Sequence, residues 1–108
     1  MIEAKFYVKE SGVISGFEIS GHSGYSDSGS DIVCAAVSSA AYMTVNTLSD
    51  VMMIDLDVTV NDDLGIMNVK IFERDFSKYS QIIMGFKKHL ILLEEMYPKN
   101  IKVSYLEV

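Results

Sequence analysis

The 108-residue sequence is poor in three residue types, since it has one cysteine, one proline and no tryptophan. Cys34 has no second cysteine with which to form an internal disulfide, so packing must hold the fold, as is usual in a reducing compartment. We therefore expect a cytoplasmic protein. One cysteine and two histidines also fall short of the ligand set of a structural zinc site, so no metal and no other cofactor is expected.

Basic residues are scarce too. Nine Lys and Arg stand against fifteen Asp and Glu, which gives a formal net charge of −6. Such a surface repels phosphate backbones, so direct nucleic-acid binding is not expected, whereas basic protein partners are mildly favoured.

Long hydrophobic runs suited to a membrane are missing as well. The most apolar region, residues 32–54, is interrupted by Ser, Thr, Asn and Asp, so it predicts a buried helix followed by a strand. The first residues enter an alternating pattern directly, without a basic segment, an apolar stretch and a cleavage site. No export signal is therefore expected.

The composition is that of a packed globular protein, with 49% hydrophobic and 22% charged residues. The chain is too short for two cores, because each would form from only about 50 residues. We therefore expect a single domain that spans residues 1–108.

Hydrophobic periodicity predicts five strands and two helices. Residues 2–9 alternate between apolar and polar side chains, which is the period of a strand with one buried face. Apolar residues recur at helical spacing from residue 31 to about residue 48, and again from residue 76 until Pro98 stops the second helix. The other strands are expected at residues 13–20, 54–60, 67–71 and 101–105.

The resulting order is β-β-α-β-β-α-β, with every strand half-buried. This order predicts an α+β fold, a two-layer sandwich in which two helices pack on one face of a mixed or antiparallel sheet. The pattern does not assign the edge strands of the sheet, although pairing between two copies of the chain is one way to cover an edge.

Two side chains of strongly catalytic types flank residues 23–30, a run of Ser, Gly and Asp with one Tyr that predicts a mobile surface loop. His22 precedes this loop and Cys34 follows it. If Asp31 is the N-cap, Cys34 takes the third helical position, where unpaired backbone N–H groups and the helix dipole stabilise a thiolate. An imidazolium at His22 would lower the pKa of the thiol further and could return its proton to a leaving amine. The spacing permits this pair without requiring it.

The alternative is purely structural. Cys34 stands among Val33, Ala35 and Ala36 and could be a small buried hydrophobe, while His22 could merely end a strand. On composition and spacing alone this interpretation is the commoner one for a lone Cys and a lone His.

Two neighbours of Cys34 have open roles. Ser38 follows it by four positions, on the same helix face, where its hydroxyl could bond the imidazole or the substrate, or could serve close packing. Asp31 could cap the helix, together with or in place of Ser30, or could face His22 and orient the ring.

The sequence around these residues resembles the signature of the ribosomal-processing cysteine protease Prp family (YsxB-like). The resemblance rests on Gly21-His22, on a Ser/Gly/Asp-containing loop, and on the run Gly29-Ser30-Asp31-Ile32-Val33-Cys34-Ala35-Ala36-Val37-Ser38. It continues through Thr44, Asn46 and Leu48, and the predicted element order agrees with the small α+β fold of that family over essentially the whole chain.

The resemblance implies a bacterial cytoplasmic endopeptidase that removes a short N-terminal extension from a large-subunit ribosomal protein and forms a homodimer. It matches His22 and Cys34 to the catalytic pair of the family. It matches Asp31 and Ser38 to supporting positions, and Gly21 to a glycine that lets the loop move aside for substrate.

The loop that separates the pair is expected to cover the site and to order around an extended peptide. Its residues Ser23, Gly24, Tyr25 and Gly29 are the candidates for substrate contact, and Tyr25 is the large side chain among them. Ser23 departs from the alanine that the family often has there, a change between two small residues.

Two other functions remain open at this stage. The first is a noncatalytic module that docks on a ribosomal protein. The second is a sensor in which a single activated thiol is oxidised reversibly, and it is restricted to intermolecular or small-thiol adducts because no resolving cysteine exists.

Overall fold

The computed structural model describes residues 1–21 and 28–108, except for the side chains of residues 28–31. The elements follow the predicted order, which is thereby confirmed. They are β1 (Ile2–Val8), β2 (Ile14–Ser20), α1 (Ser28–Asn46), β3 (Leu56–Asn61), β4 (Ile66–Ile71), α2 (Phe76–Met96) and β5 (Ile101–Glu107).

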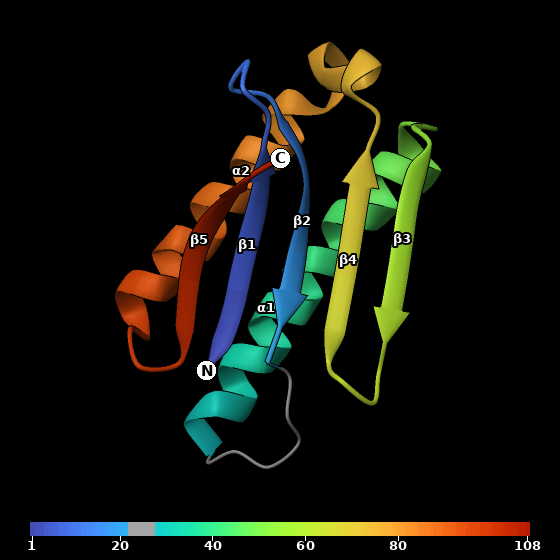
Figure 1. The fold of residues 1–108 in the computed structure, drawn as a ribbon. Coiled ribbons are helices and arrows are strands. Elements are labelled where there is room, and N and C mark those ends of the chain that lie inside the picture. Colours follow the sequence, from blue (N-terminus) through green and yellow to red (C-terminus); the bar gives the residue numbers. More distant parts are fainter. Residues whose placement is uncertain (22–27) are drawn as a thin grey trace.

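The five strands form one mixed sheet in the order β3-β4-β2-β1-β5. β5 runs parallel to β1, and the other neighbours pair antiparallel. Both helices lie on one face of this sheet, and the other face carries no helix (Figure 1). The predicted two-layer α+β sandwich is therefore confirmed, and β3 and β5 are its edge strands.

The core lies between the sheet and the helices because the alternating apolar positions of the strands point toward α1 and α2. Phe6 of β1 pairs in register with Phe17 of β2, and both are fully buried. The Phe86 ring, from α2, lies 4.8 Å from the ring of Phe17 and 5.8 Å from the ring of Phe6, between centroids. Offset aromatic contacts of this kind add to the hydrophobic free energy of burial.

The two helices bury the stripes that their apolar spacing predicts. The buried residues of α2 are Tyr79, Ile83, Phe86, Leu90 and Leu93. On α1 the stripe comprises Val33, Val37, Ala41 and Thr44. The stretch Ile32–Val51 is long and apolar enough for a membrane span by length and composition alone, yet this stripe packs against the sheet as in a core helix.

The ends of α1 differ from the prediction. The helix begins at Ser28, so residues 28–30 are helical where a loop is predicted, and the rest of that predicted loop lies outside the described residues. At its other end α1 passes into a π-helical turn, Thr47–Val51, in which the Met52 N–H donates to the Thr47 carbonyl. The wider turn keeps Leu48 buried, and local propensity does not encode it.

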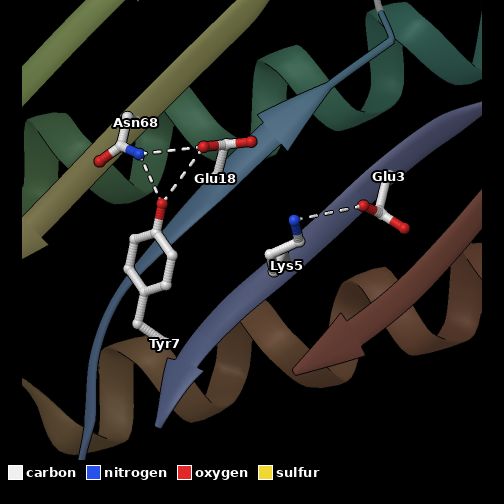
Figure 2. Close-up of polar contacts among 5 residues, drawn as sticks. All are labelled: Glu3, Lys5, Tyr7, Glu18 and Asn68. Atoms are coloured by element: carbon white, nitrogen blue, oxygen red, sulfur yellow. Dashed lines mark hydrogen bonds and ion pairs between the residues drawn. The ribbon is translucent and has the colours of Figure 1, made fainter. Parts of the chain in front are cut away.

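The helix-free face of the sheet is polar. Figure 2 shows that the Tyr7 hydroxyl donates to Glu18 Oε2 at 3.3 Å. Asn68 Nδ2 donates to the same oxygen at 3.1 Å, and it also donates to the Tyr7 hydroxyl. Lys5 and Glu3 form an ion pair nearby at 3.7 Å. Burial, with the Glu18 charge next, raises the pKa of Tyr7.

Tyr79 ties α2 to the start of β2. Its side chain is fully buried, and its hydroxyl donates to the Ile14 carbonyl at 2.8 Å. Burial, with smaller contributions from Glu73 and Asp75, raises the pKa of Tyr79 to about 12. The folded state therefore holds this proton more tightly than the unfolded chain does.

Replacement Tyr79→Phe is expected to lower the free energy of unfolding at neutral pH by about 1 kcal/mol, because the Ile14 carbonyl loses its buried donor. Since the pKa is raised on folding, the contribution of Tyr79 is complete below the unfolded pKa of about 10 and is lost as the pH rises through about 12. Urea unfolding at pH 7 and pH 11 should therefore show a smaller loss of stability with pH in the variant. An equal loss of unfolding free energy between pH 7 and pH 11 in both proteins would contradict the assignment of the raised pKa to Tyr79.

Candidate active site

Cys34 is the seventh residue of α1, because the helix begins at Ser28. The prediction that Asp31 or Ser30 caps the helix is therefore wrong, and so is the third helical position for Cys34. At the seventh position the backbone N–H bonds within the helix, and the effect of the helix dipole falls off beyond the first turn. The start of the helix alone therefore gives the thiolate less stabilisation than the sequence predicts.

Cys34 and Ser38 lie on one side of the buried stripe of α1. At 100° per residue the stripe of Val33, Val37 and Ala41 faces the sheet, and the positions 34, 38 and 42 follow it around the helix. Cys34 is partly buried and packs against the core, while Ser38 is half-buried. The predicted shared face of Cys34 and Ser38 is confirmed by the helical geometry.

A cleft of about 220 Å³ opens on that side of α1, between the helix and the β3–β4 hairpin. Ser38, Ala41 and Tyr42 form its helical wall. The opposite wall comes from the ends of the strands and their turn: Ile19, Val60, Asn61, Asp62, Gly65, Ile66 and Met67. Cys34 precedes Ser38, which lines the cleft, by one helical turn, about 6 Å along the helix axis.

The hairpin wall of the cleft was not predicted from the sequence. Tyr42 follows Ser38 by four positions, so helical spacing could have found it. Asn61 and Asp62 carry no local signal beyond that of a turn, because only the sheet topology brings this hairpin to α1.

Among the described residues the single histidine, His89, lies on α2 on the other side of α1. It lines the groove between the two helices, together with Ala36, Ala40 and Thr44 of α1. Ala36 and Ala40 lie around the helix from Cys34, beyond the buried stripe, and Thr44 belongs to the stripe itself. His89 is therefore no partner for the thiol.

His22 itself lies outside the described residues, as do Ser23, Gly24 and Tyr25. Gly29 and Asp31 belong to the first turns of α1. The end of β2 and the start of α1 lie at the same end of the sheet (Figure 1).

Gly21 fixes the direction in which the chain leaves β2. Its φ of +93° is in the region that favours glycine, and a Cβ at this position would collide with the Met1 carbonyl oxygen. Glycine is therefore required at the residue before His22 for two reasons. The backbone there is left-handed, and the start of β1 approaches it closely.

Acidic, histidine and cysteine side chains do not gather into a metal site in the described part of the chain, where no group of three is suitably placed. The chemistry of this region therefore has to be argued from the side chains of α1 and of the residues that precede it.

Comparison with known proteins finds one family over nearly the whole chain. The family model described as "Cysteine protease Prp" matches residues 1–102. The ribosomal processing cysteine protease Prp of Staphylococcus aureus strain Mu50 is 25% identical over 105 residues, which cover 97% of this chain and 99% of that protein. The protein of the same name from strain NCTC 8325 matches equally.

Solved structures share the fold. The crystal structure of the S. aureus ribosomal processing protease Prp with a substrate peptide superposes with a TM-score of 0.90 at 24% identity, covering 98% of this chain and 100% of that one. SMU.848 from Streptococcus mutans superposes with a TM-score of 0.88 at 27% identity, covering 100% of this chain and 96% of that one.

Two exposed left-handed glycines, one in the first hairpin and one at the exit of β2, provide a matched pair of substitutions. A Cβ added at Gly12, where φ is +90°, would meet no atom within 4 Å, whereas a Cβ at Gly21 would meet the Met1 carbonyl. Gly12→Ala should cost about 1–2 kcal/mol of unfolding free energy through backbone strain alone. Gly21→Ala should cost measurably more in the same urea titration, and equal losses would show that the contact with Met1 relaxes freely.

Proposed function

The chain belongs to the cysteine protease Prp family, and from that premise we propose that it removes a short N-terminal extension from a large-subunit ribosomal protein, with Cys34 as nucleophile and His22 as its acid–base partner. The premise makes the protein a cysteine protease. The family relatives in S. aureus carry the name ribosomal processing protease, and their crystal structures hold a substrate peptide and a covalently linked product peptide. These names support the proposed class of substrate.

One observation carries the assignment of the nucleophile. A cysteine protease needs a cysteine thiolate, and the sequence contains a single cysteine. Cys34 also precedes Ser38, which lines the cleft, by one helical turn. The structural alternative, in which the thiol is only a small core side chain, leaves the protease without a nucleophile.

The same elimination supports His22. The sequence has two histidines, and His89 lies in the groove on the far side of α1. His22 follows Gly21 directly in the sequence, and β2, which precedes Gly21, ends at the end of the sheet where α1 begins (Figure 1). Because the helix start lies too far from Cys34 to ionise it alone, an imidazolium is the group required to hold the thiolate.

The proposed reaction has two balanced steps. The Cys34 thiolate attacks the scissile carbonyl carbon, a C–S bond forms, and the C–N bond breaks as the His22 imidazolium gives its proton to the departing amine. Water then loses a proton to the neutral imidazole and attacks the thioester, and the C–S bond breaks. This restores the thiolate–imidazolium pair and releases the new carboxylic acid, which loses its proton to solvent. No cofactor takes part in either step.

Ser38 and Asp31 support the pair in this proposal. The Ser38 hydroxyl, at the cleft, donates to the substrate or bonds the imidazole. Asp31 lies inside α1, so the role of N-cap is excluded for it and the role of orienting the ring of His22 remains. Gly21 directs the chain toward the site, and Ser23, Gly24, Tyr25 and Gly29 contact the peptide.

We further propose a cytoplasmic homodimer that binds the basic ribosomal protein and makes no direct contact with nucleic acid. The net charge of −6 supports attraction of a basic partner and repulsion of phosphate. The family resemblance supports the dimer and the compartment.

The decisive experiment uses the N-terminally extended ribosomal protein from the same cell. Incubation with the parent enzyme should give one trimmed product by intact-mass analysis, and Cys34→Ala should abolish it while the variant still binds the substrate. Cleavage by neither protein, with binding by both, would identify a noncatalytic docking module instead. Circular dichroism of the variant checks that it folds.

The pair also has a pH signature. Alkylation of Cys34 by iodoacetamide should stay appreciable well below a pH of about 8.5, the ordinary pKa of a thiol, and His22→Ala should remove this low-pH reactivity. His89→Ala is the matched control and should leave the profile unchanged. A profile that His22→Ala does not shift would mean that no ion pair forms before substrate binds.

A further inference from the structure

The sheet protects its two edge strands differently. At the β5 edge the Val103 N–H donates to the Glu94 carboxylate at 2.7 Å, so a side chain of α2 covers an outward-facing backbone donor. No side chain in the described ranges makes such a bond to β3. An unpaired edge is a template for an added strand, so proteins normally shield it.

The face of β3 on the helix side of the sheet, called its underside here, is apolar and exposed. α1 crosses the sheet obliquely, and its C-terminal end lies behind the upper part of β3 (Figure 1). Leu56, at that upper end, is half-buried, whereas Val58 and Val60 are 39% and 44% exposed. Tyr42, on the facing side of α1, is 47% exposed. The lower half of β3 thus carries apolar side chains without a covering layer.

This open edge runs into the cleft that Ser38 and Tyr42 line. Val60 and Asn61 end β3, and both line the cleft opposite Ser38 and Tyr42. Tyr42 lies two turns from Cys34, about 12 Å along the helix axis. An extended peptide rises about 3.3 Å per residue, so about four residues span the axial distance between Cys34 and Tyr42.

The charge of the segment suits a basic peptide. Residues 51–66, which contain β3 and its turn, hold four aspartates and no lysine or arginine. Asp55 pairs with Arg74 at 3.8 Å, and Asp57 stands opposite Lys70 in the sheet register. The other two aspartates, Asp62 and Asp63, lie in the turn at the cleft. Their charge favours cationic side chains of a bound peptide over acidic ones.

We propose that the substrate binds as an extended sixth strand on the outer edge of β3, with alternate side chains resting against Val58, Val60 and Tyr42. Backbone hydrogen bonds to β3 give affinity, and the apolar underside selects the side chains that face it. The inference rests on the proposed peptidase function and adds the mode of substrate recognition to it.

Backbone methylation of the substrate tests this geometry. A peptide that spans the cleavage site is prepared in versions that each carry one N-methyl group, and KM and kcat are measured with the parent enzyme. On one side of the scissile bond, methylation of every second residue should raise KM about five- to tenfold. Each of these methyl groups removes one backbone hydrogen bond, which is worth about 1 kcal/mol. A series without this period-two pattern would overturn strand addition.

A pair of variants tests the edge from the side of the enzyme. Val58→Lys places a charge in the apolar underside, outside the cleft, and should raise KM for the long peptide but not for one truncated before it reaches β3. Leu106→Lys is the matched control, since Leu106 is 45% exposed on the opposite edge strand, and its KM should be that of the parent. Equal KM values for all three proteins would contradict the proposal.

The outcomes separate the two proposals. If the parent cleaves no peptide and Cys34→Ala changes nothing, the proposed function fails. If cleavage depends on Cys34 while methylation and Val58→Lys leave KM unchanged, only strand addition fails. If Val58→Lys instead turns a dimer into a monomer at unchanged KM, measured by light scattering, the β3 edge pairs two copies of this chain and the proposed substrate strand is overturned.

Discussion

The packing of α1 against the sheet is the constraint on which the rest depends. Val33, Val37 and Ala41 are buried because they face the strands, and this contact fixes the rotation of the whole helix. Once the rotation is fixed, Ser38 and Tyr42 must face the β3–β4 hairpin, while Ala36 and Ala40 must face α2. A rotation by one residue would expose the stripe and turn the thiol into the core, at a cost of several kcal/mol in lost burial.

The oblique path of the same helix divides the sheet into covered and open parts. Where α1 and α2 lie behind the strands, the sheet has a dense core built around Phe6, Phe17 and Phe86. Where α1 leaves the lower half of β3, a cleft forms and apolar side chains remain exposed. The place where the sandwich is incomplete is thus also the side of α1 on which Ser38 and Tyr42 line a cleft. Binding sites on a rigid scaffold commonly lie at such gaps, because a filled core has no room for a ligand.

Much of the fold could be predicted because periodicity is local. The alternation of β1 and the stripe of α2 each identify an element and its buried face, and the structure confirms both. The start of α1 could not be predicted, because Ser and Gly favour loops and caps by propensity, yet Ser28–Ser30 are helical. The π-helical turn was missed for a similar reason. It contains Leu48, which is fully buried, and the Ile54 N–H beyond the turn donates to the Leu48 carbonyl, but no local sequence pattern predicts it.

The sequence by itself determined the element order and the family, and its single cysteine makes Cys34 the candidate for the nucleophile of the proposed reaction. Only the tertiary structure decided that Cys34 stands in the seventh position of its helix, that His89 lies on the wrong side of it, and that the β3–β4 hairpin forms the facing wall. The physical reason is the range of the interactions. Helices and strands reflect neighbours a few positions apart, whereas strand order, the free edge and the cleft arise from pairings between segments that are distant in the chain.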